Sequence, residues 1–274
     1  DPLPTTNGAT GNPTAGNAFT GDLINGAPAT TTNATVAVKT PATAINGGPI
    51  PSMDPATGVV SVPAGTPAGT YTIVYTLCEK LNPTNCKDAT ITVPVGAAPI
   101  DAKDDTYTAV NGATGNTNVG NVVTGTGTGS VADTLNGAPT TLTNTALSVV
   151  TPAAPVAGAP VGAPVPVLDP ATGTLVVPPG TPAGVYNITY KLCEKLNPTN
   201  CDTAVAKVTV DPSPIVATPD SYTGINGATG NPNVGSALGN DAVNGATATV
   251  GSTGNATLAI NTPAASIGGA PVPV

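Results

Sequence analysis

The sequence has no histidine, no arginine and no tryptophan, and it has one phenylalanine and one methionine in 274 residues. Charged residues make up 8% of the chain, and glutamate occurs only at Glu79 and Glu194. Histidine is the commonest acid–base catalyst near neutral pH and a frequent zinc ligand. Because histidine is missing and acids are few, the sequence predicts a protein that is not an enzyme.

Charge and hydropathy exclude two classes of partner. The formal net charge is −8 and the sequence pI is about 4.1, so there is no basic patch to neutralise phosphates, and nucleic acid is excluded. No run of about 20 apolar residues occurs, so no direct membrane insertion is expected. No secretory leader is present, which means little in a chain that we expect to begin and end within a longer array.

Turn formers and β-formers dominate what remains. The chain has 33 glycines and 31 prolines, and threonine, valine, alanine and asparagine are abundant. This composition is typical of short strands joined by tight turns, which predicts an all-β protein. Disorder is the alternative for so much proline and glycine, but repeated strand patterns and paired cysteines argue against it.

One stretch occurs twice, at residues 63–93 and 178–208. The nine residues CEKLNPTNC are identical in both copies and start 115 residues apart, at Cys78 and Cys193. This spacing is far longer than a solenoid repeat and matches a small all-β domain. The chain is therefore predicted to consist of copies of one module.

The repeated stretch predicts a β-hairpin with one buried face. A Gly-Thr-Pro-Ala-Gly turn or its close variant precedes a segment in which large apolar and polar residues alternate, as in a half-buried strand. After the Leu-Asn-Pro-Thr-Asn loop, a partner strand alternates in the same way. The residues expected in the core are Tyr71, Ile73, Tyr75, Leu77, Ala89, Ile91, Val93 and Val95, and in the second copy Tyr186, Ile188, Tyr190, Leu192, Ala204, Ala206, Val208 and Val210.

By the same alternation, all four cysteines leave from the solvent face near the closed end of the hairpin. We expect one disulfide between Cys78 and Cys86 and another between Cys193 and Cys201, each worth about 2–3 kcal/mol in a chain-entropy estimate. A metal site is disfavoured, because the spacing is wrong for zinc and no histidine completes the ligands. Paired cysteines and low charge favour an oxidising, extracellular location.

Each complete module has about seven strand candidates with turns every 8–12 residues, which predicts tandem immunoglobulin-like β-sandwich modules in an extended array. The expected modules are 1–98, with its first strand clipped, 99–214, and 215–274. The third stops before the hairpin and should not be stable alone. We therefore expect it to be part of a longer array or to be completed by another chain.

Two further features concern loops and turns. The second module carries a Gly/Thr-rich insert at about 125–132 and an extra stretch at about 158–165, both expected in surface loops. Tyr71 and Tyr186 stand where a tyrosine corner would place its hydroxyl against the preceding turn. The alternative for both is a plain tyrosine at the edge of the core.

Acidic residues lie mostly in turn contexts. Asp54 and Asp169 each open an Asp-Pro-Ala-Thr-Gly turn, and three others precede Asn-Gly turns, so we interpret all five as caps of the local backbone. The other three are Asp22, Asp133 and Asp241.

Calcium is the sharper hypothesis for the acidic residues at the first junction, Asp101, Asp104 and Asp105. The second junction has Val216, Pro219 and Asp220 at the corresponding positions, so a calcium ion in every junction is disfavoured. Calcium at the first junction stays open, and no other cofactor is expected.

The full pattern consists, in this order, of NGATGN, NGAP, LDPATG, PAGTY or PAGVY, and LCEKLNPTNC. It resembles the tandem repeats of very large surface adhesins of Bacteroidota. These include gliding-motility adhesins and related proteins exported by the type IX secretion system. The resemblance covers nearly the whole chain, and LCEKLNPTNC is its most specific part. It implies an extracellular, cell-anchored thread of Ig-like modules.

The same bacteria attach O-glycans at Asp-Ser/Thr followed by a small or aliphatic residue. The resemblance therefore implies candidate glycosylation sites at Thr134 and Thr203. The first module has Leu23, after Asp22, in place of Thr134, and Asp88, before Ala89, in place of Thr203, so the modules would differ in their glycans.

Two functions follow as hypotheses. The first is a structural stalk or adhesive repeat segment of a secreted bacterial surface adhesin, with further copies of the module in cis and a surface or glycan ligand that the sequence does not name. The alternative is a subunit of an extracellular filament in which a neighbouring chain completes residues 215–274.

Overall fold

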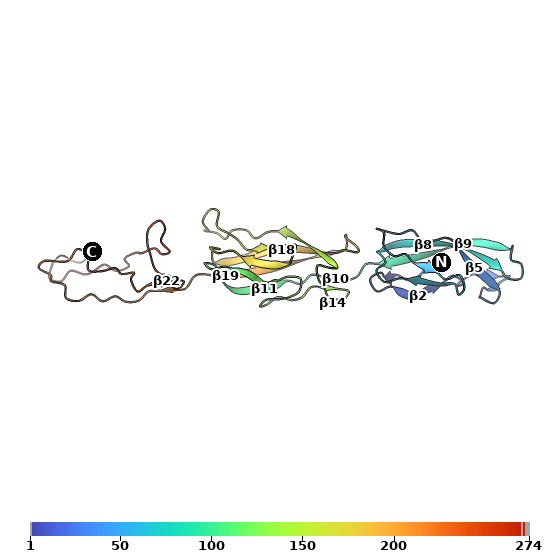
Figure 1. Cartoon of the computed structure of the whole chain (residues 1–274), viewed down its shortest axis with the longest axis horizontal. Coiled ribbons are helices and arrows are strands. Elements are labelled where there is room, and N and C mark those ends of the chain that lie inside the picture. The colour runs from blue at the N-terminus through green and yellow to red at the C-terminus, as the bar shows by residue number, and fades with distance from the viewer. Residues whose placement is uncertain (1, 270, 272–274) are drawn as a thin grey trace.

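The computed structural model describes residues 2–269 and 271. The chain forms consecutive bodies that lie end to end, with residues 2–96 in the body at one end and the region after residue 215 at the other (Figure 1). Secondary structure throughout the described residues is strand, bridge, turn and bend, and no helix capable of crossing a membrane occurs in them.

The first module is a two-layer sandwich. One sheet has the order β1-β9-β8-β5 and the other has the order β2-β7-β6. β1 runs parallel to β9, and every other strand pair in the module is antiparallel. The strands are β1 (Thr6–Asn7), β2 (Asn12–Asn17), β3 (Leu23–Ile24), β4 (Ala27–Pro28), β5 (Ala34–Thr40), β6 (Ser52–Met53), β7 (Val59–Val62), β8 (Gly69–Glu79) and β9 (Cys86–Gly96).

The second module repeats this order as β11-β19-β18-β15 and β12-β17-β16. Its preceding linker adds a strand, β10, to the edge of the β13–β14 hairpin. The strands are β10 (Ile100–Asp101), β11 (Asp105–Asn111), β12 (Asn116–Asn121), β13 (Thr134–Leu135), β14 (Ala138–Pro139), β15 (Thr145–Thr151), β16 (Val167–Leu168), β17 (Thr174–Val177), β18 (Gly184–Glu194) and β19 (Cys201–Asp211). Four strands facing three in this order form an immunoglobulin-like sandwich, as the sequence predicted.

The long hairpin is the centre of each core. Tyr186, Ile188, Tyr190 and Leu192 of β18 are at most 1% exposed, whereas the alternating Val185 is 51% exposed. The same alternation holds on β8, where Tyr71, Ile73 and Tyr75 are buried and Leu77 is half-buried. The predicted core face of the hairpin is confirmed in both modules.

The two tyrosines nearest the start of the hairpin also fix the turn before it. The Tyr71 hydroxyl donates a hydrogen bond to the Pro67 carbonyl at 2.9 Å, and the Tyr186 hydroxyl donates to the Pro182 carbonyl at 2.8 Å. Each ring therefore fills the core while its hydroxyl satisfies a carbonyl of the Gly-Thr-Pro-Ala-Gly turn. This is the geometry of a tyrosine corner.

The third region forms only one small sheet, of β20 (Ile215–Val216), β21 (Ala242–Val243) and β22 (Ala246–Thr247). The other described residues of this region form no strand. In the second module β11 pairs with β19, β12 with β17 and β15 with β18, so these three strands of the first half depend on partners from the second half. Residues 215–271 lack those partners. Tyr222 is accordingly 42% exposed, whereas the corresponding Tyr107 is 1% exposed.

The two extra pieces of the second module differ from each other. Residues 158–165 lie in a surface loop, as expected, with Val161 fully exposed. Residues 125–132 instead fold back on the sandwich. The Thr106 amide donates to the Gly129 carbonyl at 3.1 Å, and the Ser130 hydroxyl donates to the buried Asp105 at 2.7 Å. The insert therefore lies in a surface loop, as expected, and these hydrogen bonds hold it against the sandwich.

The burial pattern of β18 predicts the cost of single truncations. Ile188→Ala should destabilise the second module by about 2–5 kcal/mol, because it leaves a cavity in a packed core. Val185→Ala on the outer face of the same strand should cost less than about 1 kcal/mol. Thermal unfolding of the full chain measures both, and similar costs for the two variants would contradict the assignment of faces.

Candidate functional site: the joint between modules

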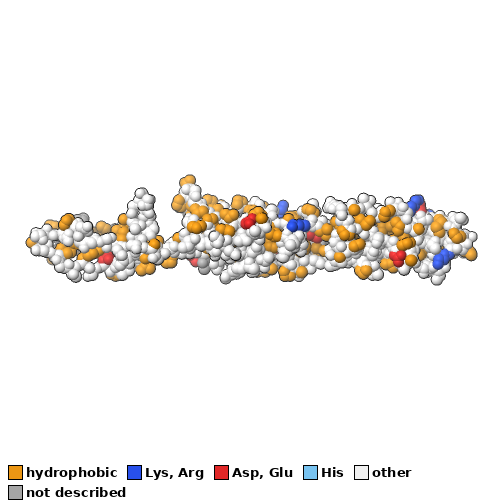
Figure 2. Space-filling view, in the orientation of Figure 1, with side chains coloured by type: hydrophobic (Ala, Val, Ile, Leu, Met, Phe, Trp, Pro, Cys, Tyr) orange, Lys and Arg blue, Asp and Glu red, His pale blue; other side chains and the backbone are white. Residues whose placement is uncertain are grey.

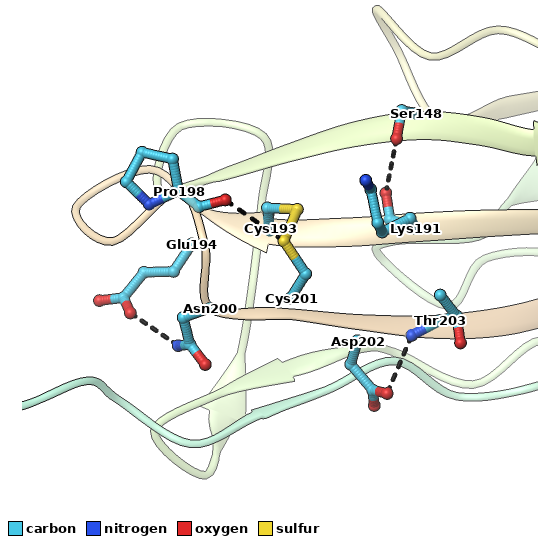
Figure 3. Close-up of a disulfide and its surroundings, with 9 residues drawn as sticks. All are labelled: Ser148, Lys191, Cys193, Glu194, Pro198, Asn200, Cys201, Asp202 and Thr203. Atoms are coloured by element: carbon cyan, nitrogen blue, oxygen red, sulfur yellow. Dashed lines mark hydrogen bonds between the residues drawn. A yellow bond between two sulfur atoms is a disulfide. The ribbon is translucent and has the colours of Figure 1, made fainter.

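The closed end of each long hairpin carries a disulfide. Cys78 bonds Cys86 and Cys193 bonds Cys201, with Cα–Cα distances of 4.1 and 4.0 Å between directly paired residues. All four residues are exposed or half-buried, on the outer side of the hairpin. Each bond ties together the last residue pair before the loop, so the loop leaves from a fixed base (Figure 3).

The loop of the second module is organised around a buried carboxylate. Glu194 is 2% exposed, and its Oε2 accepts hydrogen bonds from the side-chain amides of Asn197 at 2.9 Å and Asn200 at 2.8 Å. Figure 3 shows Glu194 and Asn200 turned toward each other beside the disulfide. Two amide donors satisfy the carboxylate, which makes its burial tolerable.

This loop contacts the preceding module. The Ala68 amide of the first module donates to the Asn197 Oδ1 at 2.6 Å, and the Asn200 amide also donates to the Ala98 carbonyl at 2.7 Å. Asn197 is 7% exposed. Each asparagine thus bridges Glu194 to the backbone before the second module. We call this end of a module, with its loop and its short hairpin, the head, and the opposite end the tail.

A second contact recurs at both junctions. The Asn7 side-chain amide donates to the Asn136 Oδ1 at 2.8 Å, and the Asn111 amide donates to the Asn244 Oδ1, also at 2.8 Å. Asn136 and Asn244 have φ values of 56° and 53° in two-residue Asn-Gly turns. Asparagine tolerates this left-handed conformation, and the turn presents its side chain to the preceding tail.

The first module provides an internal comparison, because its CEKLNPTNC loop has no module in front of it in this structure. The Asn85 amide donates to the Glu79 Oε2 at 3.0 Å, and hydrogen bonds from Asn85 and Asn82 lower the pKa of Glu79. Leu81 is 84% exposed, and both asparagines are exposed. The same nine residues therefore keep the bond between the last asparagine and the glutamate in both loops, but the glutamate and the first asparagine are buried only in the second module, where a tail meets the loop.

The linker ahead of the second module lies along the head. Ile100 and Asp101 pair antiparallel with Leu135 and Thr134. Backbone and side-chain hydrogen bonds fix the rest of the linker. They are Asn136 N to the Pro99 carbonyl at 2.7 Å, Ala102 N to Asp202 Oδ2 at 3.0 Å, Lys103 N to Asp133 Oδ1 at 2.7 Å, and Val205 N to Asp104 Oδ1 at 2.8 Å.

Two buried carboxyl groups lie beneath this linker. Asp105 and Asp133 are 1% and 0% exposed, and the Tyr190 hydroxyl lies 3.3 Å from an oxygen of each. Desolvation raises the pKa of Asp133 to about 7, with the charge of Asp105 adding to the effect. Desolvation also raises the pKa of Asp105, opposed by hydrogen bonds from Ser130 and Val131. The Tyr190 hydroxyl donates to the Lys103 carbonyl at 2.8 Å.

The turn-capping interpretation holds for two of the five aspartates. Asp54 and Asp169 each accept from the amide two residues on and from the threonine hydroxyl three residues on. The other three accept hydrogen bonds from residues distant in the sequence, which corrects the interpretation of them as caps of the local backbone. Asp133 and Asp241 accept from linker amides, and Asp22 accepts from the Tyr75 hydroxyl at 2.6 Å.

The acids of the calcium hypothesis point to different partners. Asp101 forms an ion pair with Lys103, Asp104 accepts from the Val205 amide, and Asp105 is buried against Ser130. Across residues 2–269 and 271, no group of three or more histidine, cysteine, aspartate or glutamate side chains is arranged to hold a metal ion.

The candidate glycosylation residues differ in access. Thr203 is exposed on β19, next to the half-buried Asp202. Thr134 is half-buried in β13 beside the linker strand, and the preceding Asp133 is completely buried. An enzyme that reads an Asp-Thr pair could reach Thr203 in the folded module far more easily than Thr134.

No family model and no curated protein matches the sequence. Among solved structures, the human desmocollin-1 ectodomain is similar with 11% identity over 69% of this chain and 35% of that chain, at a TM-score of 0.31. Human CDH23 EC21-23 is similar with 12% identity over 81% of this chain and 76% of that chain, at a TM-score of 0.29. Protocadherin gamma B2 extracellular cadherin domains 3–6 are similar with 12% identity over 77% of this chain and 49% of that chain, at a TM-score of 0.30. These likenesses assign neither family nor function.

The buried Asp133 predicts a pH dependence. Its folded pKa of about 7 exceeds the ordinary value of 3.8, so the folded module holds a proton that the unfolded chain releases above about pH 4. The free energy of unfolding is therefore highest below about pH 4, where Asp133 is protonated in both states. It falls as the pH rises to about 7, because the unfolded chain loses this proton first. We expect the second module to be more stable at pH 5 than at pH 8, by on the order of 2 kcal/mol.

Hydrogen exchange of β18 and β19 across this pH range measures the effect. Asp133→Asn should flatten the profile, whereas the exposed turn cap variant Asp54→Asn should leave it unchanged. A second module whose stability rises from pH 5 to pH 8 would contradict the protonated state of the pair.

Proposed function

We propose that this chain is a non-catalytic repeat segment of an extracellular adhesin, in which the modules form an extended, semi-rigid stalk. The observation that supports it most is the CEKLNPTNC loop. In the first module Glu79 is half-buried and Asn82 is exposed, whereas the identical Glu194 and Asn197 of the second module are buried where a tail meets the loop. A motif with residues that become buried at a junction is suited to joining modules in series.

The surface supports an exposed, outward-facing role. Charged side chains form isolated spots among neutral and apolar ones (Figure 2). Both disulfides are complete, and the described residues have no free cysteine. Such a chain suits an oxidising extracellular setting.

The finer assignment rests on the repeat sequence. We propose a cell-surface adhesin of Bacteroidota, of the gliding-motility or type IX secretion kind, with further modules in cis and a surface or glycan ligand. Thr203 is the better of the two proposed O-glycan sites because it is exposed, whereas Thr134 is half-buried beside the linker strand.

The filament subunit stays as a second candidate because of the third region. Leu258, Ile260 and Ile267 are 61%, 73% and 88% exposed. Leu258 and Ile260 correspond by sequence to Leu147 and Val149 of β15, which pack against the second core. A neighbouring chain that supplied the missing strands would cover these side chains. The intact mass of the native protein separates the candidates, since a mass close to 26 kDa would favour the subunit.

The joint predicts a contrast between two identical residues. Asn197→Ala removes the acceptor for the Ala68 amide and one donor to Glu194, so the docked joint should lose about 2- to 10-fold in population. Asn82→Ala, at the same position of the exposed loop, should leave the joint unchanged. Small-angle scattering of the full chain should show a shorter mean length for the first variant alone, and equal lengths would contradict the coupling role.

The cellular role is tested by immunogold electron microscopy of source cells with antibody against residues 99–214. Gold along thin threads rooted in the outer surface is the expected result. Gold on regular filaments shed into the medium would contradict the stalk and establish the filament subunit. Gold confined to the cell interior would contradict both.

A further inference from the structure

The linker segments ahead of the second and third modules bind their heads in the same way. In each, a proline carbonyl accepts from the backbone amide of the turn asparagine, at 2.7 Å for Pro99 and Asn136 and 2.8 Å for Pro214 and Asn244. The next two residues pair antiparallel with the edge of the short hairpin. The two segments share the sequence Pro-Ile-x-Ala.

A third shared contact fixes the register. The amide three residues after the isoleucine donates to an aspartate carboxylate, from Lys103 to Asp133 and from Thr218 to Asp241, at 2.7 Å in both. Ile100 packs against the second core, and Ala102 belongs to that core with 9% exposure. The linker is thus a strand added at the edge of each head, and in the second module Ile100 and Ala102 turn toward the core.

The first module has the corresponding groove, and it is open. A groove of about 750 Å³ lies between the short β3–β4 hairpin and the start of β9. It is lined by Asp22, Leu23, Ile24, Asn25, Leu77 and Asn85, among others. These positions correspond by sequence to Asp133, Thr134, Leu135, Asn136, Leu192 and Asn200, and five of these six bind or pair with residues 98–103.

Residues around the open groove are more exposed than the corresponding residues of the second module, where the linker strand covers them. Leu192 and Ala204 are 0% and 3% exposed, whereas the corresponding Leu77 and Ala89 are only half-buried. Leu23 on the open hairpin is 60% exposed, and the corresponding Thr134 is half-buried. Asp22 is half-buried and bonds Tyr75, while Asp133 is completely buried under its linker.

We propose that this groove of the first module is a binding site for an extended Pro-Ile-x-Ala segment supplied by another module of the same kind. The segment binds by strand addition. Its proline carbonyl accepts from the backbone amide of Asn25, and its isoleucine pairs with Ile24 and covers Leu77 and Ala89. The backbone amide of the residue after its alanine donates to the Asp22 carboxylate. The proposal rests on the two occupied heads and not on the adhesin assignment.

One position distinguishes this groove from the occupied one. Asp202 accepts from the Ala102 amide in the second module, and Lys87 stands at that position in the first. The open groove therefore offers one acceptor fewer. Lys87→Asp should restore it and tighten binding about 2- to 10-fold, whereas Lys87→Ala should not.

The test uses the full chain and a synthetic peptide with the sequence of residues 97–104, AAPIDAKD, blocked at both ends. Amide NMR shifts on titration should be confined to residues 21–25 and 85–89 and to Leu77. A peptide carrying Ile100→Asp should bind at least about 10-fold more weakly, because it would place a charge against the apolar floor of the groove. Equal binding of the two peptides, or shifts spread over both modules, would overturn the proposal.

A second measurement does not require a separate peptide to bind tightly, because it attaches the segment to the chain. The same eight residues are fused directly ahead of residue 1, which corresponds by sequence to their position ahead of Asp105 in the second module. The melting temperature of the first module should rise by on the order of 5 °C, and the matched fusion with Ile100→Asp should not raise it. If neither fusion changes the melting temperature, the groove is not a strand-addition site.

Discussion

The pairing of β18 with β19, and of β8 with β9, is the constraint on which the rest of each module depends. Each strand has eleven residues, so the hairpin spans about 35 Å. Its inner face supplies two core tyrosines in each module, and its outer strand edges pair with β1 and β5 in the first module and with β11 and β15 in the second. Its open end forms part of the tail and its closed end forms the head. One element therefore connects consecutive joints, and the disulfide fixes its loop at the point where the next contact begins.

The third region shows the same constraint from the other side. Its first-half segments keep the residues that form strands in the second module, yet without a hairpin they have nothing to pair with. What it retains is local: Ile215 and Val216 still bind the β21–β22 hairpin, as the linker does in the second module. The pairing of a linker with the short hairpin therefore needs only local residues and not the long hairpin.

Much of the fold could be predicted because it follows from local patterns. Period-two alternation gave the core face of the hairpin, the parity of the cysteines placed both disulfides outside, and Asp54 and Asp169 cap the turns that they open. The joint could not be predicted in this way. Asn82 and Asn197 lie in identical nine-residue sequences, and only the neighbouring module makes one exposed and the other buried. Asp133 and Ser130 are similar cases, because their partners come from the linker and from β11 rather than from the adjacent sequence.

The central claim is that direct hydrogen bonds at the head hold the first and second modules in one orientation. Residual dipolar couplings of the full chain, measured separately for the amides of residues 2–96 and 105–211, test this most directly. If the joint is docked, both sets fit a single alignment tensor in the relative orientation of Figure 1. Two tensors of clearly different magnitude would show that the modules move independently, and would contradict the account of the chain as a semi-rigid stalk.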